Sequence, residues 1–291
     1  MRIDTLIIVI VIAALIFAVI WHDIHNFVVR EYEVKTDKIK GNMTFVFLAD
    51  LHGYSYGTNN ERLIKAIDDI APDCILCAGD MMVGRGSEKN KDSLKSGEEL
   101  LKNLASRYPV YSANGNHEKN LKSFTNIYGN LFDRYRERLR RAGVIYLEDE
   151  SALFPDKNIR ITGLDMDMDY FRKVIKKRME PDYLDRKIGE MNAADKNMFQ
   201  ILIAHNPQYF PEYAGWGADL TVSGHVHGGI IRLPLLGGVI SPALALFPKY
   251  DGGKFERDGK TMILSRGLGT HTIHVRFYNP AEISVIKIKG V

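Results

Sequence analysis

Histidine, aspartate and asparagine residues recur at the ends of short apolar runs along this 291-residue chain. Their imidazole nitrogens and carboxylate or amide oxygens are common ligands of divalent metal ions. The first run, T-F-V-F-L-A-D (44–50), is short and rich in β-branched and aromatic residues, as buried strands are. The residues that follow the runs are Asp50 and His52, Asp80, Asn116 and His117, His205, and His225 and His227. Side chains at the carboxyl ends of strands in an open α/β sheet converge on one crevice, so the pattern predicts a metal site.

The distribution of the histidines supports this interpretation. A lone aspartate at a strand end is usually a turn residue, and a lone histidine is more often a hydrogen-bonded polar group than a ligand. Here five of the nine histidines fall at strand ends, whereas the pairs His22/His25 and His271/His274 lie elsewhere. Glycines such as Gly79 flank these positions and permit the tight turns that bring the backbone close to an ion.

The elements that must position these residues alternate between strand and helix in the first half of the chain. Helices are predicted over 60–70, with Asn60 as the N-cap, over 93–106, and over 121–142 as one long basic helix. Strands are predicted over 44–50, 72–78, 110–113, 144–147, 159–163, 199–204, 219–223, 261–265 and 283–288. The early alternation predicts an α/β fold, and the late strands predict a mixed or two-layer sheet.

The N-terminus is predicted to be a membrane anchor. Residues 6–21 form an apolar run, ~24 Å long as a helix against a hydrocarbon core of ~30 Å. A cleaved signal peptide is the alternative, but no small-x-small motif follows the run. Basic residues after the span outnumber Arg2 before it, which favours a single-pass protein with its catalytic domain in the cytoplasm. We predict an anchor over 1–29, a linker over 30–43 and a catalytic domain over 44–291.

Composition and net charge limit the class of protein and its partners less strictly than the motifs do. The chain is 45% hydrophobic, which is enough for a large core, and its formal net charge of +3 is compatible with anionic substrates or lipid headgroups. It has no basic stripe with interleaved aromatic residues, so we expect no nucleic-acid partner. Cys74 and Cys77 form a C-x-x-C motif. A redox or half-zinc role is possible, but a buried strand is favoured because no second pair completes a zinc site.

Together the motifs resemble the calcineurin-like metallophosphoesterase superfamily. They are D-x-H (50–52), G-D (79–80), G-N-H-E (115–118), His205 and G-H-x-H (224–227), and the resemblance covers 44–291. The anchor, S-R-G-L-G (265–269) and V-R-F-Y-N-P-A-E-I (275–283) are similar to small membrane-anchored bacterial phosphoesterases. That branch is itself similar to enzymes that split UDP-2,3-diacylglucosamine in lipid A synthesis. The resemblance implies a two-layer mixed β-sheet sandwich flanked by helices.

The resemblance also implies a role for each site residue. One metal ion is held by Asp50, His52 and His227, a second by Asn116, His205 and His225, and Asp80 bridges the two. Such mixed ligands suit Mn, Fe, Zn or Ni. Two divalent ions ~3.5–4 Å apart activate a shared hydroxide for attack on phosphorus. His117 stabilises the developing charge or protonates the leaving oxygen, and Glu118 either orients His117 or is purely structural.

Substrate contacts are predicted at Arg85, Arg266 and Arg276, because guanidinium groups match phosphate oxygens; otherwise these are ordinary surface or salt-bridge residues. The apolar segment 237–250 either rims the site and contacts lipid or is a packed loop. The predicted enzyme hydrolyses a phosphodiester or pyrophosphate bond in a phosphorylated small-molecule or lipid-linked substrate at a membrane, such as a UDP-acylglucosamine-like lipid precursor. The alternatives are a phosphodiesterase or phosphomonoesterase acting on nucleotides or phosphoproteins, and a non-catalytic membrane-tethered binding protein.

Overall fold

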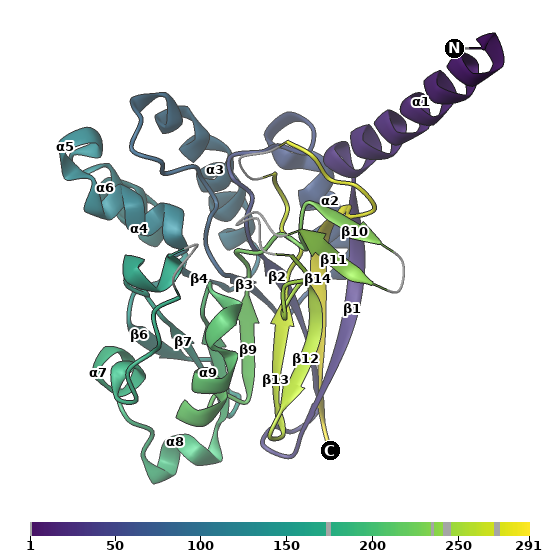
Figure 1. Cartoon of the computed structure of the whole chain (residues 1–291). Coiled ribbons are helices and arrows are strands. Elements are labelled where there is room, and N and C mark those ends of the chain that lie inside the picture. Colours follow the sequence, from purple (N-terminus) through teal and green to yellow (C-terminus); the bar gives the residue numbers. More distant parts are fainter. Residues whose placement is uncertain (1, 173–175, 234–235, 241–245, 271–273) are drawn as a thin grey trace.

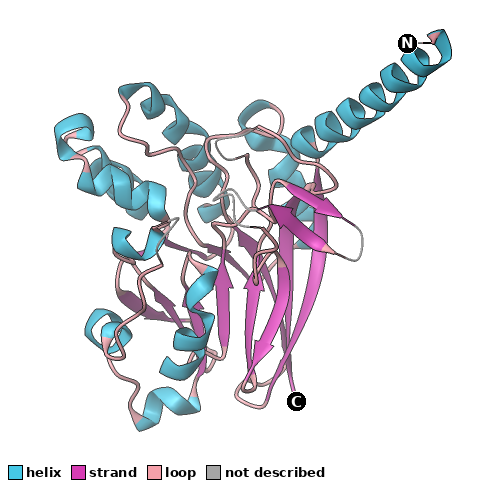
Figure 2. Ribbon diagram, in the orientation of Figure 1, coloured by secondary structure: helices cyan, strands magenta, loops and turns pink. Residues whose placement is uncertain are grey.

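The computed structural model describes residues 2–172, 176–233, 236–240, 246–270 and 274–291. Two six-stranded sheets pack face to face, and helix α1 (Ile3–His25) projects from one end of the molecule (Figure 1). Helices cover the outer faces of the sandwich (Figure 2). The predicted two-layer mixed sandwich flanked by helices is confirmed.

The first sheet carries the amino-terminal half of the site. In spatial order it consists of β1 (Phe27–Thr36), β14 (Ala281–Gly290), β2 (Asn42–Leu48), β3 (Cys74–Cys77), β4 (Val110–Ala113) and β5 (Ile145–Leu147). Strands β2 to β5 are parallel, whereas β14 is antiparallel to β2 and parallel to β1. Parallel neighbours need crossover connections, and helices provide them here: α2 (Glu61–Ile70), α3 (Leu94–Ala105), α4 (Asn116–Ser123), α5 (Thr125–Tyr128) and α6 (Leu131–Arg141).

The second sheet carries the carboxyl-terminal half of the site. In spatial order it consists of β12 (Gly253–Arg257), β13 (Lys260–Leu264), β9 (Leu220–Ser223), β8 (Phe199–Ile203), β7 (Ile159–Gly163) and β6 (Glu150–Leu153). Its four inner strands are parallel and both edge strands are antiparallel. The other α-helices and strands described are α7 (Tyr183–Ile188), α8 (Ala193–Asn197), α9 (Phe210–Trp216) and the hairpin of β10 (Ile231–Leu233) and β11 (Gly237–Ile240).

The core between the sheets is built from alternate residues of their strands. Phe45 and Phe47 of β2 meet Ile201 of β8 there, while Val46 and Leu48 face the helices on the other side of the first sheet. This is the period-2 pattern of a strand buried on both faces. Cysteines follow it too: Cys74 packs between the sheets and Cys77 on the helix side, both as free thiols. The buried-strand interpretation of the C-x-x-C motif is therefore confirmed.

The predicted linker over 30–43 is largely a strand in the structure. Strand β1 pairs with β14 from Phe27 opposite Ala281 to Thr36 opposite Gly290. Its sequence, F-V-V-R-E-Y-E-V-K-T, alternates apolar and charged residues because it is an edge strand with one face in water. That pattern lacks the continuous apolar run of the central strands, so the sequence suggested a linker. Helix α1 therefore leads directly into the sheet.

Two helix predictions are also corrected. The single helix expected over 121–142 is divided into the end of α4, α5 and α6, with one break at Phe124 and another at Gly129, whose φ is 56°. Asn60 precedes α2 but does not cap it through its side chain, since its own φ is 61°. Its amide oxygen instead accepts a hydrogen bond from the backbone N–H of Tyr56, and its amide nitrogen donates to Ser96.

Candidate metal centre

Loops from both sheets meet at one edge of the sandwich and bring the predicted ligands together. His205 follows β8 in the second sheet, yet its Nε2 lies 3.1 Å from Oδ2 of Asp80, which follows β3 in the first. The same nitrogen lies 3.6 Å from Oδ1 of Asp50, after β2. His227, after β9, places its Nε2 3.5 Å from that Oδ1 atom. The parallel strands of the two sheets thus end at a common edge.

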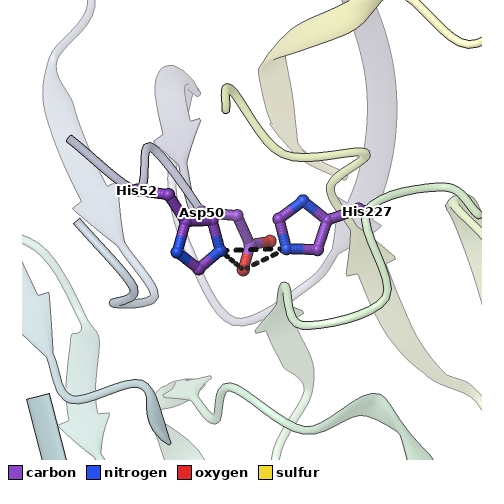
Figure 3. A group of neighbouring side chains, drawn as sticks. All are labelled: Asp50, His52 and His227. Carbon is purple, nitrogen blue, oxygen red and sulfur yellow. Dashed lines mark hydrogen bonds and ion pairs between the residues drawn. The ribbon is translucent and has the colours of Figure 1, made fainter. Parts of the chain in front are cut away.

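One group of ligand atoms consists of Asp50, His52 and His227, which all lie within 4.8 Å of one another. Figure 3 shows the two imidazole rings on either side of the carboxylate. The Nε2 atoms of His52 and His227 are 3.0 Å apart, and the rings are stacked with centroids 4.9 Å apart. All three side chains are buried. Two nitrogens and one carboxylate oxygen around a common point are a donor set that suits a divalent transition metal.

A second group lies beside the first and contains Asp80, His205 and His225, also within 4.8 Å. Asn116 joins it, since its Oδ1 lies 2.7 Å from Nδ1 of His225. His205 places its Nδ1 2.6 Å from the carbonyl oxygen of Ala78, so this nitrogen carries the proton and Nε2 is left to face the carboxylates. Asn116 and His225 are only partly buried, so the site reaches the surface on this side.

The backbone at five of these positions is in the left-handed region. The φ values are 57° at Asp50, 49° at His52, 54° at Asp80, 75° at His225 and 55° at His227. Non-glycine residues rarely adopt this conformation, and it persists only where surrounding contacts enforce it. Strain of this kind gathers at functional sites, and here it coincides with the side chains that converge.

Close backbone packing fixes the loops that follow β3 and β4. A Cβ atom on Gly79 would lie 2.0 Å from the backbone nitrogen of Gly115, and one on Gly115 would lie 2.2 Å from Oδ1 of Asp80. Only glycine fits such contacts. These two glycines let the Asp80 loop lie directly against the loop that begins α4.

His117 is buried against the Asp80 carboxylate. Its backbone N–H donates to Oδ1 of Asp80 at 2.8 Å, and its Nε2 lies 3.9 Å from Oδ2. The Nδ1 atom accepts a 2.8 Å hydrogen bond from the backbone N–H of Gly84. Burial lowers the pKa of His117, so the ring is neutral near pH 7 and its proton sits on Nε2, directed at the site.

Glu118 supports the Asp80 loop rather than the ring of His117. Its buried carboxylate accepts hydrogen bonds from the backbone N–H groups of Asp80 at 2.8 Å, Met81 at 2.9 Å and Gly115 at 3.0 Å. Of the two roles that the sequence left open, the structure therefore favours the structural one. The orientation of His117 comes from Gly84.

The buried charges influence one another strongly. Burial raises the pKa of Asp50 to about 7 against the opposing effect of His205. For Asp80, burial is outweighed by His205 and His117, which hold its pKa well below the usual value. Burial would lower the pKa of His205, but Asp80 and Asp50 raise it to about 9. Carboxylates packed this closely are a suitable environment for cations, which would favour ionisation of both.

The three predicted substrate arginines differ in their surroundings. Arg85 is exposed and close enough to Asp80 for their charges to interact. Arg266 is partly buried, with its Nε 3.5 Å from a carboxylate oxygen of Glu282. Arg276 is buried and donates to four backbone carbonyl groups, so it holds a loop and we do not propose it as a substrate contact.

Sequence reasoning missed several residues that support the site. The side-chain amide of Asn279 donates to the carbonyl oxygens of His227 and Gly229, both at 2.7 Å. Its backbone N–H donates to the buried carboxylate of Asp23 at the end of α1. Phe171 packs its ring 5.2 Å from that of His225. The sequence carried two signals: the polar interruption around Asp23 after the apolar run, and the motif V-R-F-Y-N-P-A-E-I (275–283), which contains Asn279.

The chain belongs to the calcineurin-like phosphoesterases, because the model of that family matches residues 43–229. The uncharacterized metallophosphoesterase YkuE of Bacillus subtilis is 25% identical over 91% of this chain and 87% of its own length. Phosphodiesterase YaeI of Escherichia coli is 26% identical over 77% and 74%. The UDP-2,3-diacylglucosamine pyrophosphatase LpxG of Chlamydia trachomatis is 25% identical over 84% and 83%. The resemblance seen in the motifs is confirmed, and the protein is a metallophosphoesterase, a hydrolase of phosphate esters.

Proposed function

We propose that the protein hydrolyses a phosphodiester or pyrophosphate bond with a two-metal centre, on a substrate held at a membrane. The observation that carries the first part is the position of Asp80. Its carboxylate belongs both to the group with His52 and His117 and to the group with His205 and His225. A carboxylate between two sets of ligands has an oxygen for each of two cations.

In the proposed arrangement, Asp50, His52 and His227 would hold one ion, Asn116, His205 and His225 would hold a second, and Asp80 would be shared by both. Bound divalent ions of this kind supply an activated water nucleophile and neutralise phosphoryl charge; Mn, Fe, Zn and Ni all suit the ligands. The chain itself supplies orientation through the backbone amides that bind Asp50 and Asp80.

His117 has a separate role in the proposed reaction. Its Nε2–H points at the site, because Nδ1 is occupied by the N–H of Gly84. This proton can be donated to a phosphoryl or leaving-group oxygen as charge develops there. The exposed Arg85 guanidinium, near Asp80, is proposed to contact the substrate phosphate. Arg266 is a second candidate, because its side chain packs against Gly228, the residue after His227: a Cβ atom on Gly228 would lie 3.0 Å from Cγ of Arg266.

The membrane part of the proposal rests on α1. This helix of 23 residues is long and apolar enough to cross a bilayer, and none of its most apolar stretch of 18 residues is buried within the protein. Asp23 near its end is bound by Asn279, a contact that cleavage of a signal peptide would remove, so we propose a retained anchor. The basic residues that follow favour the cytoplasmic side for the catalytic domain. The likeness to LpxG favours a lipid-linked nucleotide such as a UDP-acylglucosamine.

Metal-dependent hydrolysis of bis-p-nitrophenyl phosphate by the full chain in detergent tests the catalytic proposal. We expect activity with added Mn²⁺, loss of activity on chelation, and collapse in Asp80→Ala. Asp69→Ala is the matched control, since Asp69 is an exposed residue of α2 paired only with Lys65 in the described residues. Wild-type rates in Asp80→Ala, or rates indifferent to chelation, would overturn the proposal.

A substrate panel then tests the proposed substrate class. UDP-diacylglucosamine, nucleotides and phosphoproteins are compared at equal concentration in the presence of Mn²⁺. Faster turnover of the acylated UDP-sugar supports the proposed substrate class. Faster turnover of soluble nucleotides instead supports a general phosphodiesterase, the activity for which YaeI is named.

A further inference from the structure

The end of α1 and the candidate metal centre lie at the same edge of the first sheet. Strand β14 is antiparallel to β2, so its first residue, Ala281, lies at the end of β2 that leads to Asp50. Strand β1 is parallel to β14 and begins with Phe27 opposite Ala281. Helix α1 ends at His25, directly before β1. It therefore leaves the domain beside the ligand-bearing loops (Figure 1).

Exposed apolar side chains gather on the β10–β11 hairpin and the segments paired with it. We call Leu233, Leu236, Leu246, Phe247 and Tyr278 the hairpin rim; their exposed fractions range from 38% to 67%. They belong to one substructure, since β10 bridges to the residue before Tyr278 and the end of β11 bridges to Leu246. A cluster of large apolar side chains in water is a common sign of a protein or membrane contact. Of the predicted apolar rim over 237–250, residues 241–245 lie outside the described residues.

The hairpin rim is joined to α1 on one side and to the metal-ligand loop on the other. Tyr278 precedes Asn279, whose backbone N–H donates to Oδ2 of Asp23 at 2.8 Å. The side chain of the same asparagine donates to the carbonyl oxygens of His227 and Gly229. Because Asp23 is buried and belongs to α1, these contacts fix the helix end against the rim.

The length of α1 and the position of Trp21 indicate where the bilayer surface lies relative to the catalytic domain. At ~1.5 Å per residue the helix is ~34 Å long, enough to cross a hydrocarbon core of ~30 Å. Trp21 ends its apolar run, is exposed, and stacks on His25; tryptophan prefers the membrane–water interface. Asp23 lies ~3 Å further along the helix, so its partner Asn279 and the adjacent Tyr278 lie at headgroup depth.

We propose that the hairpin rim rests in the interface of the bilayer that holds α1. The helix fixes this edge of the sandwich against the membrane, and the rim removes its apolar side chains from water there. One consequence rests on the proposed function: the metal centre would face phosphate groups at the bilayer surface, which favours amphipathic phosphate esters over soluble ones.

Depth-dependent quenching of a fluorophore tests the contact without requiring catalysis. Leu236→Cys and Leu246→Cys variants of the full chain are labelled with NBD and reconstituted in vesicles of phosphatidylcholine and phosphatidylglycerol. The native Cys74 and Cys77 are buried, and the unsubstituted chain measures any labelling of them. Leu153→Cys is the matched control, because Leu153 is an exposed leucine at the end of β6 opposite Arg160, far from the carboxyl edge of β7.

We expect labels on the rim to show blue-shifted emission and quenching by nitroxide-bearing lipids, and the Leu153 label to be quenched mainly by an aqueous quencher. Rim labels that behave like the Leu153 label would overturn the proposal. So would protection that disappears when the protein-to-lipid ratio is lowered, since that would indicate a second copy of the chain. Because the readout is independent of turnover, a failed activity assay leaves this result intact.

Discussion

Replacement of Glu118 probes how the buried loop that carries Asp80 is supported. The carboxylate accepts three backbone hydrogen bonds at 2.8, 2.9 and 3.0 Å, and the side chain is 1% exposed. A hydrogen bond to a charged group contributes ~1.5–3 kcal/mol, and an abandoned buried donor costs ~1–3 kcal/mol. Since such contributions are not additive, we expect Glu118→Ala to lower the free energy of unfolding by ~3–5 kcal/mol.

Glu118→Gln separates the loss of charge from the loss of shape. One oxygen of the carboxylate serves Asp80 and Gly115, and the other serves Met81. A glutamine keeps one acceptor but turns an NH₂ group toward a backbone donor, so we expect a smaller loss of ~1–2 kcal/mol. Because the loop positions Asp80, Mn²⁺ affinity should fall by ~10–100-fold, as is usual when a partner of a metal ligand is removed.

Urea unfolding of the chelated full chain, followed by fluorescence, and Mn²⁺ titration measure these two effects. Glu137→Ala is the control: this glutamate lies on α6 in an exposed pair with Arg141, which contributes at most ~0.5 kcal/mol. An alanine variant at position 118 with the stability and Mn²⁺ affinity of the control would refute the assigned role.

His117→Gln should lower kcat by ~10²–10⁴ while Mn²⁺ content stays unchanged, and loss of metal instead would contradict a proton-donating role. Gly79→Ala should prevent stable folding, because residue 79 has a φ of 81° and its Cβ atom would lie 2.0 Å from a backbone nitrogen. Gly259 has a similar φ of 72° but open space around it, so Gly259→Ala should give a folded protein whose thermal midpoint is modestly lower. Asp23→Ala should weaken Mn²⁺ binding with little change in kcat at saturating Mn²⁺, whereas Asp23→Asn, which keeps an acceptor for Asn279, should restore binding. Equal Mn²⁺ affinities in the wild type and both variants would count against the link from α1 to the site. In the chelated protein, the pKa of His205 is raised to about 9, so the stabilising charge of its ring is complete below ~pH 6.5 and is lost as the pH rises to about 9. The urea midpoint should therefore fall over this pH range in the wild type and fall less in His205→Asn. An equal decrease of the midpoint with pH in both proteins would contradict this assignment.

The convergence of the candidate ligands could be predicted from the sequence because its signal is local. Each predicted ligand directly follows an apolar strand, as Asp80 follows β3 and His205 follows β8, and the rule that strand ends converge then places them together. The structure brings these side chains within the distances that a shared ion would require. Which residue holds which ion stays a proposal, as do the native metals.

The parts that the sequence did not reveal depend on contacts between distant segments. Asp23 and Asn279 are 256 residues apart, and nothing local to either residue indicates that they are in contact. Strand β1 has the alternating charges of an edge strand, so only its pairing with β14 identifies it. Arg276 looks like a phosphate ligand by type, but its burial among carbonyl groups is a property of the folded chain.

We propose that Asp80 bridges two metal ions at the common edge of the sheets. Anomalous diffraction from crystals of the full chain grown with Mn²⁺ tests it most directly. We predict two peaks ~3.5–4 Å apart on either side of the Asp80 carboxylate, one beside His52 and His227 and the other beside His205 and His225. A single peak, or peaks away from Asp80, would contradict the two-metal account.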